Sequence, residues 1–141
     1  MPVRIFGQRL HLILVVFPLG LLATSFLFDL AWLATDRATL AIAASRIMLA
    51  GIVGSAVAIV QGGFEWVAIP RRTRASHTGA LHGVGTVVVT LLFAASWLLR
   101  RDAPAQPAAL AIALSASGVV LTLLTGWLGS EVADRLAELG E

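Results

Sequence analysis

The sequence contains no cysteine, no lysine and no tyrosine, and only 13% of its 141 residues are charged. The absence of cysteine excludes disulfides, thiolate metal sites, iron–sulfur clusters held by the chain and covalently attached c-type haem. All ten basic residues are therefore arginine, and the net charge is +2. These arginines flank apolar runs, where arginine anchors helices to lipid headgroups, so we expect no binding to nucleic acid.

Apolar residues are abundant instead. They make up 58% of the chain, and the mean hydropathy is +0.90. A transmembrane helix needs about 20 mostly apolar residues, so four of them with short connections use nearly the whole length. We predict an all-α integral membrane protein, one domain over residues 1–141, with four transmembrane helices in an up-down antiparallel bundle. The predicted helices cover residues 10–33, 47–64, 81–99 and 107–128.

Tryptophan and arginine support this topology and suggest an orientation. Each predicted helix has one tryptophan at its C-terminal end, and tryptophan collects at membrane interfaces. These residues are Trp32, Trp66, Trp97 and Trp127. The side with both termini carries Arg4, Arg9, Arg71, Arg72, Arg74 and Arg135, against Arg37, Arg46, Arg100 and Arg101 on the other. Because cytoplasmic loops carry the excess of basic residues, we predict a multi-pass protein with both termini in the cytoplasm.

Two helices carry small residues at a strict four-residue spacing. The second helix has Ala50, Gly54, Ala58 and Gly62, and the fourth has Gly118, Thr122, Gly126 and Ser130. Small residues let helix backbones approach closely in a membrane. The pattern predicts packing seams, either within the bundle or against other membrane-protein subunits or a second copy of the chain.

Four ionisable residues fall near one end of the predicted bundle. His11 begins the first helix, Glu65 ends the second, His82 begins the third and Glu131 follows the fourth. In an up-down bundle all four belong to the face that carries the termini. Ionisable groups within a membrane are costly and often functional, but polar side chains near helix ends also reach water and are then only interfacial. Both interpretations stay open.

The two histidines have a spacing that suits haem. The first and third helices of such a bundle can be diagonal, about 11–14 Å apart, given neighbour spacings of about 8–10 Å. This gap fits a flat macrocycle with one imidazole on each face of the iron, so His11 and His82 are candidate axial ligands of haem b. The alternative is a simple zinc or copper site, in which Glu65 or Glu131 joins both histidines.

Other polar residues have simpler interpretations. Asp29 lies near the opposite end of the first helix, within reach of Arg37 or Arg100, and predicts an interfacial ion pair. His77 lies in the arginine-rich loop and is expected to be solvated. The sequence has no phosphate-binding glycine loop, no nucleophile elbow and no histidine pair at helical spacing, so nothing indicates a self-contained enzyme.

Several motifs follow one another along the chain. The first motif is His11 followed by Phe17, Pro18, Leu19 and Gly20. The later motifs are Gly62, Glu65, Trp66, Ile69 and Pro70, then His82 and Gly83, then Gly126, Trp127, Leu128, Gly129 and Glu131. The order of these motifs resembles that of a bacterial membrane family catalogued as domain of unknown function 2231. The resemblance implies a four-helix protein of the bacterial cytoplasmic (inner) membrane. Some relatives are joined to a Rieske-type domain, which implies electron transfer near a quinone pool, although the family has no settled activity.

The chain departs from the family pattern at several positions. The family often has a proline after the first histidine and a second histidine before the phenylalanine, where this chain has Leu12 and Val16. A metal site that uses the additional histidine is therefore not expected, whereas His11 and His82 remain. The leading hypothesis is a haem b-binding membrane subunit for electron transfer or a quinone-linked complex. The alternatives are a cofactor-free accessory subunit of a larger membrane complex and a metal-binding membrane protein.

Overall fold

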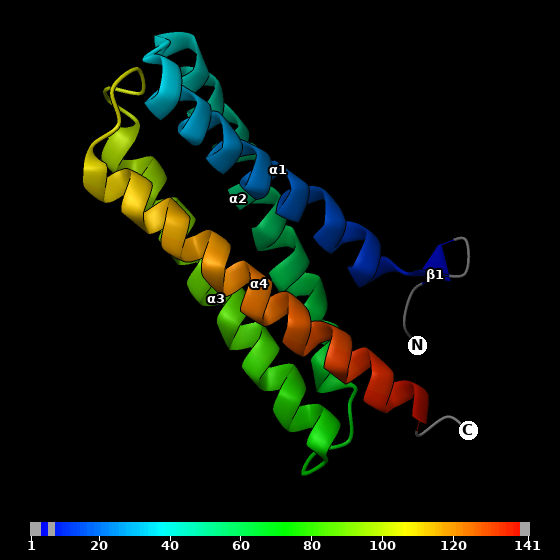
Figure 1. Cartoon of the computed structure of the whole chain (residues 1–141). Helices are drawn as coiled ribbons and strands as arrows, with labels where there is room; N and C mark the ends of the chain where they lie inside the picture. Colours follow the sequence, from blue (N-terminus) through cyan, green and yellow to red (C-terminus); the bar gives the residue numbers. More distant parts are fainter. Residues whose placement is uncertain (1–3, 6–7, 139–141) are drawn as a thin grey trace.

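The computed structural model of the chain describes residues 4–5 and 8–138 (Figure 1). Its helices are α1 (Leu10–Thr35), α2 (Ala38–Val67), α3 (Arg74–Arg100) and α4 (Ala109–Glu138). Two short strands, β1 (Arg4–Ile5) and β2 (Gln8–Arg9), pair in an antiparallel ladder ahead of α1. This two-residue ladder is the only extended structure in the described residues, and the prediction of an all-α fold is confirmed.

All four helices are long and apolar enough to cross a membrane. The segments that meet this condition are Leu14–Thr35, Ala38–Val67, Ser76–Arg100 and Ala109–Trp127. A helix needs about 20 residues to cross a hydrocarbon core of about 30 Å. Three of these segments are longer than that, and the fourth is one residue shorter. The four-span architecture predicted from hydropathy is confirmed.

The helices extend beyond the apolar runs that revealed them. α2 begins at Ala38, α3 begins at Arg74 and α4 ends at Glu138, whereas the apolar runs start at residues 47 and 81 and end at 128. Helical hydrogen bonding does not stop where hydropathy falls, so it continues to a cap or a turn. At the start of α3, for example, the Thr73 hydroxyl accepts a hydrogen bond from the Ser76 backbone N–H at 3.1 Å.

The helices form two antiparallel hairpins that lie side by side. α1 packs along α2 and α3 packs along α4, while α2 meets α3 and α1 meets α4 over smaller areas (Figure 1). α1 and α3 are therefore diagonal, as the up-down topology predicted. The start of α1, the end of α4 and the α2–α3 connection lie at one end of the bundle, which we call the terminal end; the other two connections lie at the far end (Figure 1).

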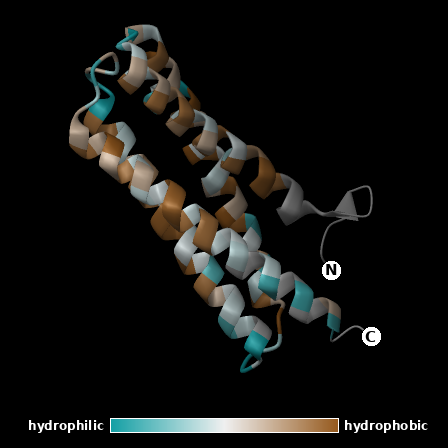
Figure 2. Cartoon of the chain, in the orientation of Figure 1, coloured by the Kyte–Doolittle hydropathy of each residue, from teal (hydrophilic) through white to brown (hydrophobic). Residues whose placement is uncertain are grey.

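The bundle has an apolar exterior and an interior rich in small polar groups. Large exposed side chains such as Phe17, Val57, Leu91 and Leu123 occur on all four helices. Hydrophobic residues follow the lengths of the helices, and hydrophilic residues gather at the connections (Figure 2). Several serines, one aspartate and one arginine are buried instead. This distribution suits lipid as the surrounding solvent, because the exterior then needs no polar groups.

Glycines permit close approach between the helices of each hairpin. A Cβ atom at Gly51 would lie 2.7 Å from the Leu22 side chain of α1. A Cβ atom at Gly118 would lie 2.7 Å from the Phe93 ring of α3. Leu22 and Phe93 belong to the same buried apolar cluster as Met48. The glycines therefore set the distance at which the helices of each hairpin meet the shared core.

The predicted seams lie only partly at helix contacts. Gly54 packs against Pro18 of α1 and Ala58 is buried, and Gly118 is buried on α4. The remaining predicted positions are exposed at Ala50, Gly126 and Ser130 and half-buried at Gly62 and Thr122. The reason is helical geometry: a step of four residues rotates about 40° beyond a full turn, so a strict four-residue stripe winds away from any contact.

The two glycines of α4 provide a matched test of this packing. Gly118→Ala is expected to lower stability by about 1–3 kcal/mol, because the new methyl overlaps the fully buried Phe93 ring. Gly126→Ala meets nothing within 4 Å and should be neutral or slightly stabilising. Apparent melting temperatures in detergent measure both. Equal losses in the two variants would contradict the contact between Gly118 and Phe93.

Candidate functional site

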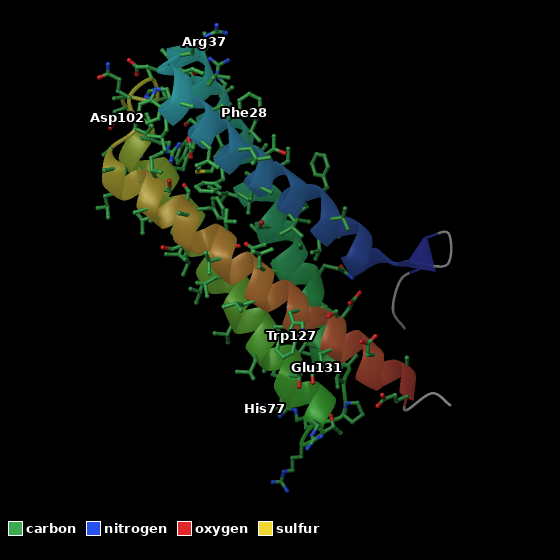
Figure 3. The ribbon with its side chains drawn as sticks, in the orientation of Figure 1. Phe28, Arg37, His77, Asp102, Trp127 and Glu131 are labelled. Atoms are coloured by element: carbon green, nitrogen blue, oxygen red, sulfur yellow. The ribbon has the colours of Figure 1, made fainter. Side chains whose placement is uncertain are left out.

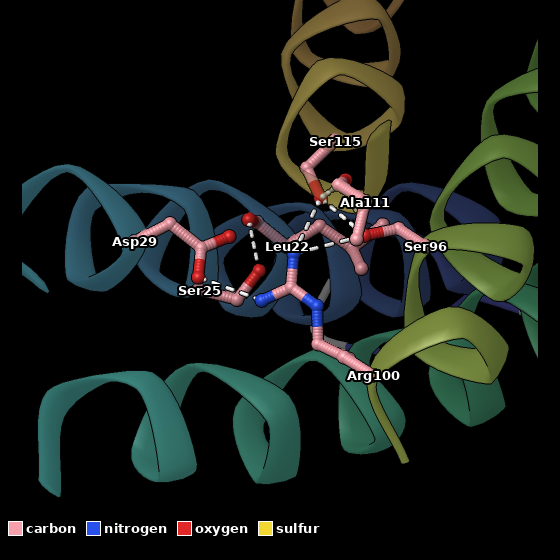
Figure 4. A network of polar contacts seen from close by, with 7 residues as sticks. All are labelled: Leu22, Ser25, Asp29, Ser96, Arg100, Ala111 and Ser115. Atoms are coloured by element: carbon pink, nitrogen blue, oxygen red, sulfur yellow. Dashed lines mark hydrogen bonds and ion pairs between the residues drawn. The ribbon is translucent and has the colours of Figure 1, made fainter. Parts of the chain in front are cut away.

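A buried ion pair joins the two hairpins near the far end of the bundle. Asp29 of α1 accepts a hydrogen bond from Arg100, the last residue of α3, with 2.7 Å between Oδ1 and Nη1 (Figure 4). Both side chains are completely inaccessible to solvent. A charge within a membrane protein requires a partner, since the desolvation cost of an isolated ion is several kcal/mol. Asp29 and Arg100 are each other's partner.

Two serines extend the ion pair to the fourth helix. Arg100 Nη2 donates to Ser96 Oγ at 2.9 Å and approaches Ser115 Oγ of α4 at 3.3 Å. Ser96 Oγ also donates to the carbonyl oxygen of Ala111 at 2.7 Å and lies 2.7 Å from Ser115 Oγ. One guanidinium therefore links α1, α3 and α4 in a network whose residues are all buried (Figure 4).

The structure selects one of the two partners expected for Asp29 and changes the character of the pair. Arg100 makes the contact, whereas Arg37 is exposed in the α1–α2 connection. The pair is also enclosed by the bundle, and neither side chain is exposed. Within the described residues, Asp29 Oδ2, Arg100 Nε and Trp32 Nε1 are buried without a hydrogen-bond partner. The sequence analysis did not predict this network, although a small hydroxyl residue one turn from a charged residue is a pattern that could have indicated it.

His82 lies near the terminal end of the bundle and contacts the neighbouring helix. Its Nδ1 atom is 2.7 Å from the backbone carbonyl oxygen of Thr125 on α4. A carbonyl oxygen only accepts, so Nδ1 carries the proton in this contact and neutral His82 keeps the lone pair on Nε2. Gly85 makes the contact possible, because a Cβ atom there would overlap the Thr125 side chain.

The other predicted site residues have different surroundings. Glu65 is half-buried on α2, and its Oε1 atom has no partner among the described residues. Glu131 is half-buried on α4 and His77 is exposed, and both lie at the terminal end (Figure 3). His11 is the second residue of α1, but its side chain lies outside the described part of the structure.

No simple metal site forms among the residues that the structure describes, since they contain no group of three histidine, aspartate, glutamate or cysteine side chains close enough to hold an ion. One hydrogen bond already occupies Nδ1 of His82. Of the two imidazoles described at the terminal end, His77 is exposed, and His82 keeps its second ring nitrogen, Nε2, outside this hydrogen bond. This nitrogen of His82 is suited to a metal ion whose other ligands come from a cofactor or from residues outside the described part of the chain.

The tryptophans at the two ends are not equivalent. Trp66 is exposed and donates its indole N–H to the Ser76 carbonyl oxygen at 2.9 Å, which ties α2 to α3. Trp127 is exposed on α4 at the same end (Figure 3). Trp97 packs against the apolar core cluster near the far end, and Trp32 is half-buried.

The ion pair can be tested with neutral isosteres. Asp29→Asn or Arg100→Gln alone leaves a buried charge without a partner, which is expected to cost about 3–5 kcal/mol. The double variant removes both charges, so the loss in its apparent melting temperature in detergent should be smaller than the sum of the losses in the two single variants. Arg37→Gln, an exposed control at the same end, should change little. Simple additivity of the two single losses would show that the charges do not interact.

Comparison with known proteins places the chain in a family. A family model described as a predicted membrane protein (DUF2231) matches residues 7–137. No curated protein and no solved structure matches the chain. The resemblance carried by the histidine, glycine and tryptophan motifs is thus confirmed over almost the whole sequence. With four membrane-spanning helices and a family match that covers all of them, the chain belongs to the DUF2231 family of predicted membrane proteins.

Proposed function

We propose that this membrane protein binds haem b at the terminal end of the bundle and serves electron transfer, alone or within a quinone-linked complex. The observation that carries the proposal is the hydrogen bond from His82 Nδ1 to the Thr125 carbonyl. Histidines that bind a metal through one ring nitrogen commonly donate the other to a carbonyl or carboxylate, which fixes the tautomer and the ring orientation. His82 has this arrangement and keeps Nε2 as the ligand atom.

The position of His11 supports a second ligand. α1 and α3 are diagonal, and His11 belongs to the first turn of α1 at the end of the bundle where His82 also lies. A diagonal separation of about 11–14 Å suits a porphyrin between two imidazoles. Bound haem would supply one-electron redox chemistry. The chain itself would hold the iron through His11 and His82, orient the His82 ring through Thr125 and present a half-buried carboxylate at Glu65.

An accessory subunit without a cofactor is the second candidate. It is favoured by the exposed small residues Gly126 and Ser130 on α4, where nothing lies within 4 Å of a Cβ atom built on Gly126. Small residues on an outer face allow another transmembrane helix to approach closely. The partner would be a larger membrane subunit or a second copy of this chain. The described residues hold no group of three metal-binding side chains, and the His11 side chain of the predicted three-ligand site lies outside them.

The location that we propose is the bacterial cytoplasmic membrane, with both termini in the cytoplasm. The burial of Arg100 supports this orientation. Arg100 pairs with Asp29 inside the bundle and does not anchor a loop to headgroups. The arginines that remain at the far end are Arg37, Arg46 and Arg101, against six on the terminal side. The bias in basic residues that sets orientation is therefore larger than the full count indicated.

The histidines provide the test of haem binding. His82→Ala and His11→Ala should each abolish the absorption band of reduced haem in protein purified from a haem-replete host, because an axial ligand is lost. His77→Ala should retain the band, since His77 is exposed at the start of α3. Difference spectra of dithionite-reduced and oxidised protein measure the result. Native protein without haem absorption would exclude the haem proposal and leave the accessory-subunit candidate.

Orientation can be measured with single cysteines in this cysteine-free chain. His77→Cys at the terminal end and Ala103→Cys at the far end both replace exposed residues and leave the arginines unchanged. A membrane-impermeant maleimide should label Ala103→Cys in spheroplasts and label His77→Cys only after lysis. The reverse pattern would invert the proposed orientation.

A further inference from the structure

A groove at the far end of the bundle runs between α2 and the end of α3. Its volume is about 220 Å³, and its lining includes Ile42, Arg46 and Leu49 from one side and Trp97 and Arg101 from the other. A neighbouring hollow of about 420 Å³ continues along α2 and shares Ile42 and Arg46. Neither hollow involves His82 or the terminal end. The feature is therefore separate from the proposed haem site.

The groove carries two positive charges with little compensation. Arg46 is exposed and makes no ion pair with any residue in the described part of the chain. Arg101 approaches only Asp102, at 3.8 Å, and the Asp102 side chain is 92% exposed. An exposed pair at this distance contributes little. Two guanidinium groups therefore border one groove in which no carboxylate neutralises them.

Adjacent arginines at the end of α3 have opposite environments. Arg100 is buried and committed to Asp29, Ser96 and Ser115, whereas Arg101 is exposed beside the groove. The internal network thus accounts for one arginine of the pair and leaves the second without a structural role. Arg46 likewise makes no ion pair with the residues that the structure describes. Charges that the fold does not use are available to a ligand.

The depth of the groove matches the headgroup layer of a membrane. Arg101 directly follows the apolar span of α3, Ser76–Arg100, and Arg46 of α2 borders the same groove. Side chains on a helix lean toward its N-terminus, so Arg46 extends toward the α1–α2 connection and away from the bilayer centre. Ala43 and Thr39, about one and two turns earlier, share a hollow with it. Below Arg46, Leu49 and Val53 are exposed on α2 and present an apolar surface.

We propose that this groove binds an anionic phospholipid. Its phosphate is held between Arg46 and Arg101, and one acyl chain lies along Leu49 toward Val53. Arginine matches phosphate through paired hydrogen bonds, and basic pockets between transmembrane helices bind anionic lipid headgroups. The Trp97 ring borders the same groove, and tryptophan favours this level of the membrane. An anion between the guanidinium groups also relieves their mutual repulsion.

The test uses the full chain in neutral detergent. Phosphatidylglycerol, the anionic probe, should raise the apparent melting temperature and give native mass spectra with one retained lipid, and phosphatidylcholine should do so at least about tenfold more weakly. Arg46→Gln and Arg101→Gln should each weaken phosphatidylglycerol binding about tenfold, because each removes a charge-assisted contact. Arg37→Gln, which changes an exposed arginine outside the groove at the same end, should retain it.

The outcomes separate this proposal from its rivals. Equal effects of the two lipids on the native chain would overturn it without reference to any variant. Equal weakening by Arg37→Gln and Arg46→Gln would indicate general attraction to a basic surface, which also overturns the specific site. Inorganic phosphate provides the last arm: if it reproduces the stabilisation by phosphatidylglycerol, the groove binds a free anion and the acyl-chain contact is wrong.

Discussion

The buried ion pair between Asp29 and Arg100 is the constraint on which the arrangement of the two hairpins depends. Packing between apolar side chains is weakly directional, and lipid offers much the same contacts as another helix, so apolar packing alone does not fix how two hairpins dock. A buried charge is different, because it is tolerated only where its partner lies. The 2.7 Å contact therefore fixes the depth and rotation of α1 relative to α3. Through Ser96 and Ser115, the same arginine also holds α4.

The interior differs between the end that holds this ion pair and the opposite end. Near the far end, the network lies beside a core that contains Met48 and Phe93, with Gly118 allowing the Phe93 ring to approach α4. Near the terminal end, contacts between helices are polar or involve glycine, as at His82 with Thr125 and at Trp66 with Ser76. The bundle thus has one end where a buried ion pair lies beside the apolar core and another end where His77, His82, Glu65 and Glu131 lie.

The sequence was sufficient for the architecture because hydrophobic runs of about 20 residues have few alternatives in a membrane. It also identified the histidines and the possible partners of Asp29. It did not distinguish Arg100 from Arg37, since both lie within reach along the helices and only the rotation of α3 decides between them. The four-residue stripes were informative at Gly54, Ala58 and Gly118 but not at Gly126, because spacing in the sequence does not include the drift of the helix. The contact between His82 and Thr125 needed the register of α3 against α4, which spacing alone does not give.

The separation of Asp29 and Arg100 along the chain has a consequence for biogenesis. The two residues are 71 positions apart, and they belong to different hairpins. At ribosomal rates of about 5–20 residues per second, Arg100 emerges about 4–14 s after Asp29. During that interval Arg100 is not available to the carboxylate of Asp29, so the contact that fixes α1 against α3 can form only after the second hairpin enters the membrane. A chain arrested before α3 would lack this buried ion pair, and the first hairpin would have to place the Asp29 carboxylate without Arg100.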